Sequence, residues 1–170
     1  ARNVADVALM LDAMAGFDPV WPLSWPAPTE GYLATCLRDA GTIRIAFSTD
    51  LGGLAPVEPE IAEALSDGMA RIDRPGLSIE GDAPALTDVD PCFRALRALG
   101  FWASARVTPE EVTRHYKPAL QQNIAEGRAL DVDSVAEALV TRSSIYDKMR
   151  QFLTRYDVIA CPVSGIGPLP

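Results

Sequence analysis

The segment from Ile43 to Glu80 restricts the fold most strongly, because it changes from the strand period to the helix period and back. Residues 43–47 alternate in the manner of a strand. Pro59 then suits the first turn of a helix, and residues 77–80 predict a second, short strand. The predicted helix has one apolar face, formed by Ile61, Leu65, Met69 and Ile72. A strand, a helix and a strand at this spacing form a βαβ unit, so we expect two parallel strands and an α/β fold.

Most of the remaining chain predicts helices. Helical periodicity and capping residues indicate four of them: one from Asn3 to Gly16, one from Asp90 to Trp102, one from Thr108 that Pro118 breaks or kinks and Gly127 ends, and one from Ser134 to Tyr156. Residues 158–161 predict a last strand. Residues 18–28 contain four prolines and are expected to cross the surface, anchored by Trp21 and Trp25.

The composition limits the classes of function. The chain has 170 residues, of which 48% are hydrophobic and 22% are charged, as in globular proteins. Its net charge of −8, with no cluster of Lys or Arg, disfavours nucleic acid or an anionic membrane as a partner. No apolar run is long enough for a transmembrane helix, and residues 1–3 do not resemble a signal peptide.

The cysteines and the single histidine give no sign of a metal or another cofactor. Cys36, Cys92 and Cys161 do not share metal-type spacing, so we expect reduced, mostly buried thiols in a cytoplasmic protein. His115 has no Cys or Asp at ligand spacing, so the sequence disfavours a role for it as a metal ligand. Residues 50–53 weakly suggest a phosphate loop but lack the Walker lysine, so a plain turn is favoured.

One pair of residues could form a catalytic dyad. Ser144 and Lys148 are four residues apart and would share a helix face, where a lysine of lowered pKa can act as base for a serine nucleophile. Asp147 and Arg150 indicate instead that this face is solvated, and no glycine-rich segment beside it offers an oxyanion site. The residues alone therefore assign no catalytic group.

Several segments, taken in order, carry a family resemblance. Residues 1–16, ARNVADVALMLDAMAG, resemble A-R-T-V-x-D-A-A-L-L-L-D-A-x-A-G, and residues 17–24 resemble an altered D-P…D-P-x-S loop. Residues 43–50, IRIAFSTD, resemble L-R-I-A-x-S-x-D, and PVEPE at 56–60 resembles the start of the helix that follows. Residues 142–162 resemble a long helix running into Y-D-x-L-x-x-P. Together the segments resemble the amidase signature family of serine hydrolases.

That resemblance implies a mixed sheet flanked by helices and the hydrolysis of an amide carbon–nitrogen bond. The family uses a Lys–Ser–Ser arrangement, with one serine on a cis peptide, and its residues precede the helix that resembles residues 1–16. Neither the lysine nor the G-S-S-G-type loop occurs here. We therefore expect residues 1–170 to be a single partial domain, incomplete at both ends, that is inactive alone and belongs to a parent enzyme.

The resemblance also implies a position for the substrate. Residues after Asp157 resemble the wall of the family's substrate pocket, so Cys161, Val163 and Ser164 are predicted to contact a small amide. Family members often have Thr-Pro-Thr where this chain has Cys161-Pro162-Val163. Packing of these residues against further strands is an equal alternative.

Other functions stay open at this point. The tyrosine-rich pattern of aminoacyl-tRNA amidotransferase subunits is absent, which favours a general amidase. Alternatives are a non-catalytic binding or interaction module and a truncated, inactive gene product. A homo-oligomer is compatible with the sequence. If strands that flank residues 158–161 are missing, the chain should dimerise, aggregate or keep a disordered end.

Overall fold

The computed structural model describes residues 1–167. The chain divides into two compact units, the first formed by residues 1–41 and the second beginning at Thr42. None of the helices within residues 1–167 combines the length and the apolar character that a transmembrane span requires.

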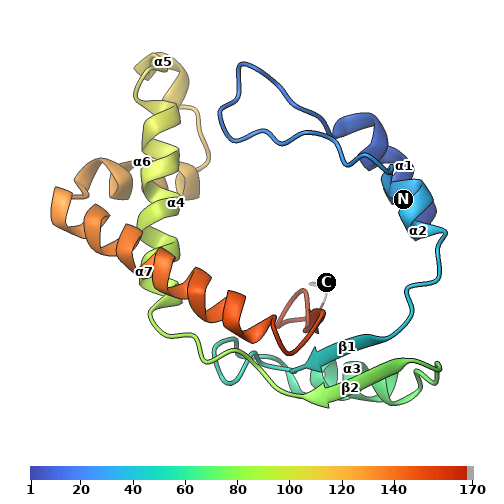
Figure 1. Cartoon of the computed structure of the whole chain (residues 1–170). Helices are drawn as coiled ribbons and strands as arrows, with labels where there is room; N and C mark the ends of the chain where they lie inside the picture. Colours follow the sequence, from blue (N-terminus) through green and yellow to red (C-terminus); the bar gives the residue numbers. More distant parts are fainter. Residues whose placement is uncertain (168–170) are drawn as a thin grey trace. The chain divides into compact units, whose positions relative to one another are not determined.

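The first unit contains helices α1 (Val4–Met14) and α2 (Tyr32–Cys36), which contact each other (Figure 1). Asn3 is the N-cap of α1, as predicted, and its side chain accepts a hydrogen bond from the Asp6 amide at 2.8 Å. The helix ends at Met14, before the predicted stop at Gly16. Ala8 is the one buried residue of this helix, and its large apolar side chains are exposed.

The proline-rich segment is held differently from the prediction. The side chains of Trp21 and Trp25 are 64% and 82% exposed, so the expectation that these rings anchor the segment is wrong. The segment is closed instead by a short polar contact. The Asp18 amide donates to the Ser24 hydroxyl at 3.0 Å, and that hydroxyl donates to the Asp18 carbonyl at 2.8 Å.

The second unit contains a parallel sheet with the strand order β2-β1-β3. Its strands are β1 (Ile43–Phe47), β2 (Leu77–Gly81) and β3 (Val158–Ala160). Helix α3 (Pro59–Ala70) connects β1 to β2, which confirms the predicted α/β fold and the parallel βαβ unit (Figure 1). The helix ends before Ile72, which the periodicity had placed on its face.

A small core covers the central strand. Ala46 of β1 is fully buried beneath Phe152, Tyr156 and Ile159. The rings of Phe152 and Tyr156 lie 5.0 Å apart, centroid to centroid. The chain segment that leads into β3 therefore packs over the strand to which β3 is paired.

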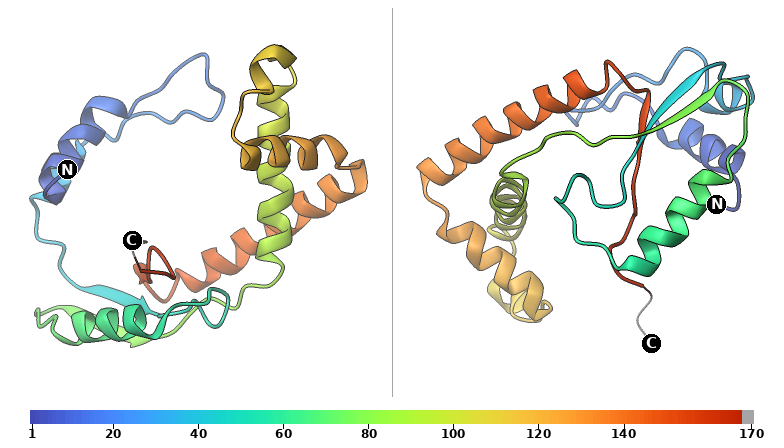
Figure 2. Two further views of the ribbon diagram at one scale, coloured as in Figure 1. Left: turned by 180° about the vertical axis from the view of Figure 1, so that it is seen from behind. Right: turned by 90° about the horizontal axis from the view of Figure 1, so that it is seen from below.

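Four further helices follow β2: α4 (Val89–Ala105), α5 (Glu110–Thr113), α6 (Pro118–Ala129) and α7 (Val132–Phe152). Helix α4 packs against both α6 and α7, and the right-hand view of Figure 2 shows α4 almost along its axis with these two helices beside it.

Gly127 does not end a helix, as the sequence suggested, but lies buried inside α6. A Cβ atom at this position would overlap the backbone carbonyl of Ala98 and lie 2.8 Å from Cβ of Trp102. The glycine is required because α6 crosses α4 at backbone contact.

Three predicted boundaries moved by a few residues. Helix α4 begins after Asp88, whose φ of 57° is left-handed, and not at Asp90. Thr108 makes no capping bond, and Pro109 precedes the short helix α5. Helix α7 ends at Phe152, so Tyr156 lies beyond it.

Candidate functional site

The carboxyl ends of the three strands meet at one edge of the sheet, because all three run parallel. Open α/β sheets bind ligands at this edge. Backbone bonds close it on both sides of β1: the Ser48 amide donates to the Ala160 carbonyl at 3.1 Å, and the Asp82 amide donates to the Phe47 carbonyl at 3.2 Å. These hydrogen bonds therefore hold the start of the segment that follows β3 in place.

An ion pair at the other end of the sheet sets the register of β3. The Asp157 carboxylate accepts three bonds from Arg44: from its amide at 2.7 Å, from Nε at 3.2 Å and from Nη2 at 3.0 Å. The Asp157 amide in turn donates to the Arg44 carbonyl at 2.9 Å. These bonds hold the pKa of Asp157 below its usual range. Two segments that carried the family resemblance thus meet through these residues.

A second polar cluster joins β2 to the segment before β3. The Tyr156 hydroxyl lies 2.9 Å from Oδ2 of Asp82 and 3.1 Å from Oε2 of Glu80, and Arg155 pairs with Asp82 at 2.9 Å. The hydrogen bond to Asp82, with the burial of the phenol, raises the pKa of Tyr156 to about 12. The same bond lowers the pKa of Asp82. Sequence reasoning missed this cluster.

The predicted substrate-binding residues Cys161, Val163 and Ser164 lie together on the segment that follows β3, and all three are exposed. The Ser164 hydroxyl donates to the Ile166 carbonyl at 3.0 Å and accepts from the Ile166 amide at 3.3 Å. Ser164 therefore shapes the turn, while Cys161 and Val163 project from it. The expectation that the cysteines are mostly buried holds for Cys92 but not for Cys161, and Cys36 is half-buried.

The same segment is held by Glu58, which sequence reasoning did not single out. The Glu58 amide donates to the Gly165 carbonyl at 2.8 Å, and the Glu58 carboxylate accepts from the Gly167 amide at 2.9 Å. The only signal in the sequence was the PVEPE segment, in which Glu58 precedes Pro59.

The geometry does not favour a Ser144–Lys148 dyad. The Lys148 ammonium donates to the Thr87 hydroxyl at 3.1 Å, on a different segment, while Ser144 is exposed. Asp147 pairs with Arg150 at 2.8 Å. No group of three or more His, Cys, Asp or Glu in residues 1–167 is placed to hold a metal ion.

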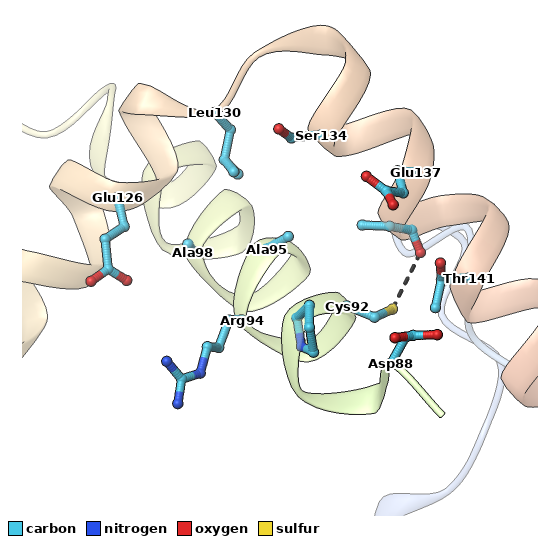
Figure 3. A pocket seen from close by; sticks show the side chains of 12 residues that line it. Asp88, Cys92, Arg94, Ala95, Ala98, Glu126, Leu130, Ser134, Glu137 and Thr141 are labelled. Carbon is cyan, nitrogen blue, oxygen red and sulfur yellow. Dashed lines mark hydrogen bonds between the residues drawn. The ribbon is translucent and has the colours of Figure 1, made fainter. Parts of the chain in front are cut away.

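A cavity of about 520 Å³ opens between α4, α6 and α7 (Figure 3). Its floor is made of small residues, and the Cys92 thiol donates to the Ala138 carbonyl there at 3.2 Å. Its polar lining residues are Asp88, Arg94, Glu126, Ser134, Glu137 and Thr141. In Figure 3, Arg94 is directed away from α7, so carboxylates and hydroxyls dominate the end near Cys92. None of the three predicted substrate-binding residues lines this cavity.

Comparisons of the sequence with known proteins show what the chain is similar to. The sequence model of the Amidase family matches residues 1–170. An acylamidase of Rhodococcus erythropolis is 29% identical over 99% of this chain and 36% of its own length. An indoleacetamide hydrolase of Bradyrhizobium diazoefficiens is 26% identical over all of this chain and 32% of its own length. The chain thus spans about a third of the length of these relatives.

Solved structures show the same fold. A bacterial aryl acylamidase of the amidase signature family matches 99% of this chain and 36% of its own chain, with a TM-score of 0.85 and 18% identity. A 6-aminohexanoate cyclic dimer hydrolase matches 98% of this chain and 37% of its own chain, with a TM-score of 0.78 and 17% identity. From the match over its whole length, the chain belongs to the Amidase family.

Proposed function

We propose that this chain is part of an enzyme that hydrolyses the carbon–nitrogen bond of a small amide, with water as co-substrate, to a carboxylate and ammonia or an amine. The observation that carries the proposal is the Amidase match over residues 1–170. The names of two relatives, an acylamidase and an indoleacetamide hydrolase, support the amide as substrate class.

The chain's own contribution is scaffold and one wall of the substrate pocket. Residues 1–170 contain no Lys–Ser–Ser arrangement, so we propose that these groups lie on other polypeptide of the same enzyme. In this account residues 1–170 form part of one Amidase domain. Cys161, Val163 and Ser164 provide the wall, because they follow β3 at the edge where parallel sheets bind ligands.

The experiment compares two proteins: the product of the whole reading frame that contains these residues, and residues 1–170 alone. Both are assayed for ammonia or amine release from a panel of aryl, indolyl and short aliphatic amides. We expect turnover by the first and none by the second. A first protein that hydrolyses no amide would favour the alternative of a non-catalytic module.

The other expectations fit this proposal. We propose a cytoplasmic enzyme that acts on a small molecule, without nucleic acid, membrane or cofactor. The net charge of −8 supports the first exclusion. We also propose that the protein associates with itself into a homo-oligomer, which the exposed apolar side chains support.

A further inference from the structure

Glu58 is in an unusual position for a residue at a helix start. It directly precedes Pro59 at the N-terminus of α3, yet its side chain makes no capping bond to its own helix. Its carboxylate oxygen Oε2 instead accepts the Gly167 amide at 2.9 Å, while its own amide donates to the Gly165 carbonyl at 2.8 Å. One residue thus holds the segment after β3 by two bonds, across 109 positions of sequence.

The backbones at this contact leave no room for a side chain. A Cβ atom at Gly165 would overlap the Pro56 carbonyl oxygen. At Gly167 a Cβ atom would lie 3.6 Å from the Glu58 carboxylate, an ordinary contact distance. The close approach is therefore specific to Gly165, and it brings the segment within reach of Glu58.

The segment between Ala160 and Ser164 is fixed at both ends. At one end, the Ala160 carbonyl accepts from the Ser48 amide at 3.1 Å, which ties it to β1. At the other end, the Ser164 turn leads directly into the residues held by Glu58. The exposed side chains of Cys161 and Val163 lie between these two fixed points.

We infer that Glu58 is a positioning residue, which holds residues 161–164 in one conformation so that their side chains present a fixed wall to the amide substrate. This inference rests on the proposed function for its substrate role. Glu58 acts through the segment and does not itself contact the reacting atoms.

The first test measures the segment itself. Hydrogen exchange of the Gly167 amide is followed by mass spectrometry with electron-transfer fragmentation in the product of the whole reading frame and in three variants. Glu58→Ala should accelerate the exchange by about tenfold, as expected for the loss of a bond to a charged acceptor. Glu58→Gln, which keeps an acceptor oxygen, should restore most of the protection. Glu60→Ala is the matched control, because this exposed glutamate lies on the same helix turn.

The second test measures substrate binding in the product of the whole reading frame. Glu58→Ala should raise KM about fivefold, with kcat within about twofold, because the wall contributes uniform binding and not chemistry. Glu58→Gln should restore KM, and Glu60→Ala should leave both constants unchanged. Gly165→Ala keeps Glu58 but forces the backbones apart, so it should raise KM in the same way.

The outcomes separate the two proposals. No turnover by the unmodified enzyme would overturn the proposed function and, with it, the substrate role of Glu58. Turnover combined with an unchanged KM in Glu58→Ala would overturn the positioning role alone. Unchanged exchange of the Gly167 amide in Glu58→Ala would overturn the contact on which the inference depends.

Discussion

At the scale of single residues, several side chains from the segments that carried the family resemblance connect parts of the chain that are distant in sequence. Arg44 and Asp157 set the register of two parallel strands. Tyr156 covers the central strand and bonds to Glu80 on the neighbouring strand and to Asp82 just after it. Arg44 and Asp157 are polar and partly accessible, so they stabilise the fold through geometry, whereas Tyr156 is buried in the core and adds apolar contact to its hydrogen bonds.

The Tyr156 cluster predicts a pH dependence of stability. The pKa of Asp82 is lowered in the folded protein, so its contribution is present above its ordinary value of 3.8 and is lost as the pH falls. The pKa of Tyr156 is raised from 10.0 to about 12, so its contribution is complete below pH 10 and is lost as the pH rises toward 12. Tyr156→Phe should therefore lower the thermal midpoint near neutral pH, and the difference from the unmodified chain should shrink at both extremes.

Tyr146→Phe provides the control. This substitution removes the same hydroxyl group, but from a tyrosine that is 71% exposed. Thermal unfolding followed by circular dichroism between pH 3 and pH 12 is the measurement. A difference between the chain and Tyr156→Phe that does not change with pH would contradict the assignment of the cluster.

At the scale of secondary structure, two contacts decide how helices meet. Asp12 of α1 accepts bonds from the amides of Tyr32 at 2.6 Å and Leu33 at 3.0 Å, and so caps α2 from outside that helix. Gly127 of α6 lets that helix approach α4 at the Ala98 carbonyl. Each contact yields a prediction that a matched substitution can check.

Asp12→Ala should destabilise the first unit by about 1 kcal/mol, the usual cost of losing an N-cap. Asp12→Asn, which keeps one acceptor oxygen, should lose less. Hydrogen exchange of the amides of residues 1–41, followed by mass spectrometry at increasing urea concentrations, measures the effect. Equal stability of Asp12→Ala and the unmodified chain would show that α2 does not depend on this cap.

Gly127→Ala should destabilise the second unit by about 1–3 kcal/mol, because the new methyl group forces α6 away from α4. Gly100→Ala is the control within α4, where an added Cβ meets no atom within 4 Å. It should stabilise the chain by up to about 1 kcal/mol through helix propensity. Equal effects of the two substitutions on the free energy of unfolding would contradict the claim that α6 and α4 can cross closely only with a glycine at position 127.

The sequence predicted the elements that local periodicity specifies, and it missed what depends on distant partners. The alternation at 43–47, Pro59 and the residues 77–80 were sufficient for the parallel βαβ unit. Gly127 was misread as a helix end because a glycine has the same local signature at a terminus and at a helix crossing. The PVEPE segment marked Glu58 only as part of a helix start, and its contact with the segment after β3 could not be predicted because its partner, Gly167, lies 109 positions away.

At the scale of the whole molecule, the described sheet has an open edge. Within residues 1–167, β3 pairs with β1 on one side and with no strand on the other. Val158 at this edge is 45% exposed. An open strand edge with apolar side chains favours pairing with another chain.

We therefore expect residues 1–170 to associate at micromolar concentrations. Val158→Lys should shift the chain toward monomer, because a charge on an edge strand opposes strand pairing. Val140→Lys, on an exposed position of α7, adds the same charge away from the sheet and serves as control. Sedimentation velocity over a range of concentrations measures this, and a monodisperse monomer throughout would contradict the expectation.

The central claim is that this chain shapes an amidase site without carrying the nucleophile. A fluorophosphonate, which reacts with activated serine hydroxyls, tests it directly in the product of the whole reading frame, with the modified serine located by peptide mass spectrometry. The account predicts a single modified serine outside residues 1–170 and no modification of the 170-residue chain. Modification of a serine within residues 1–170, with Ser144 as the first to examine, would contradict the account.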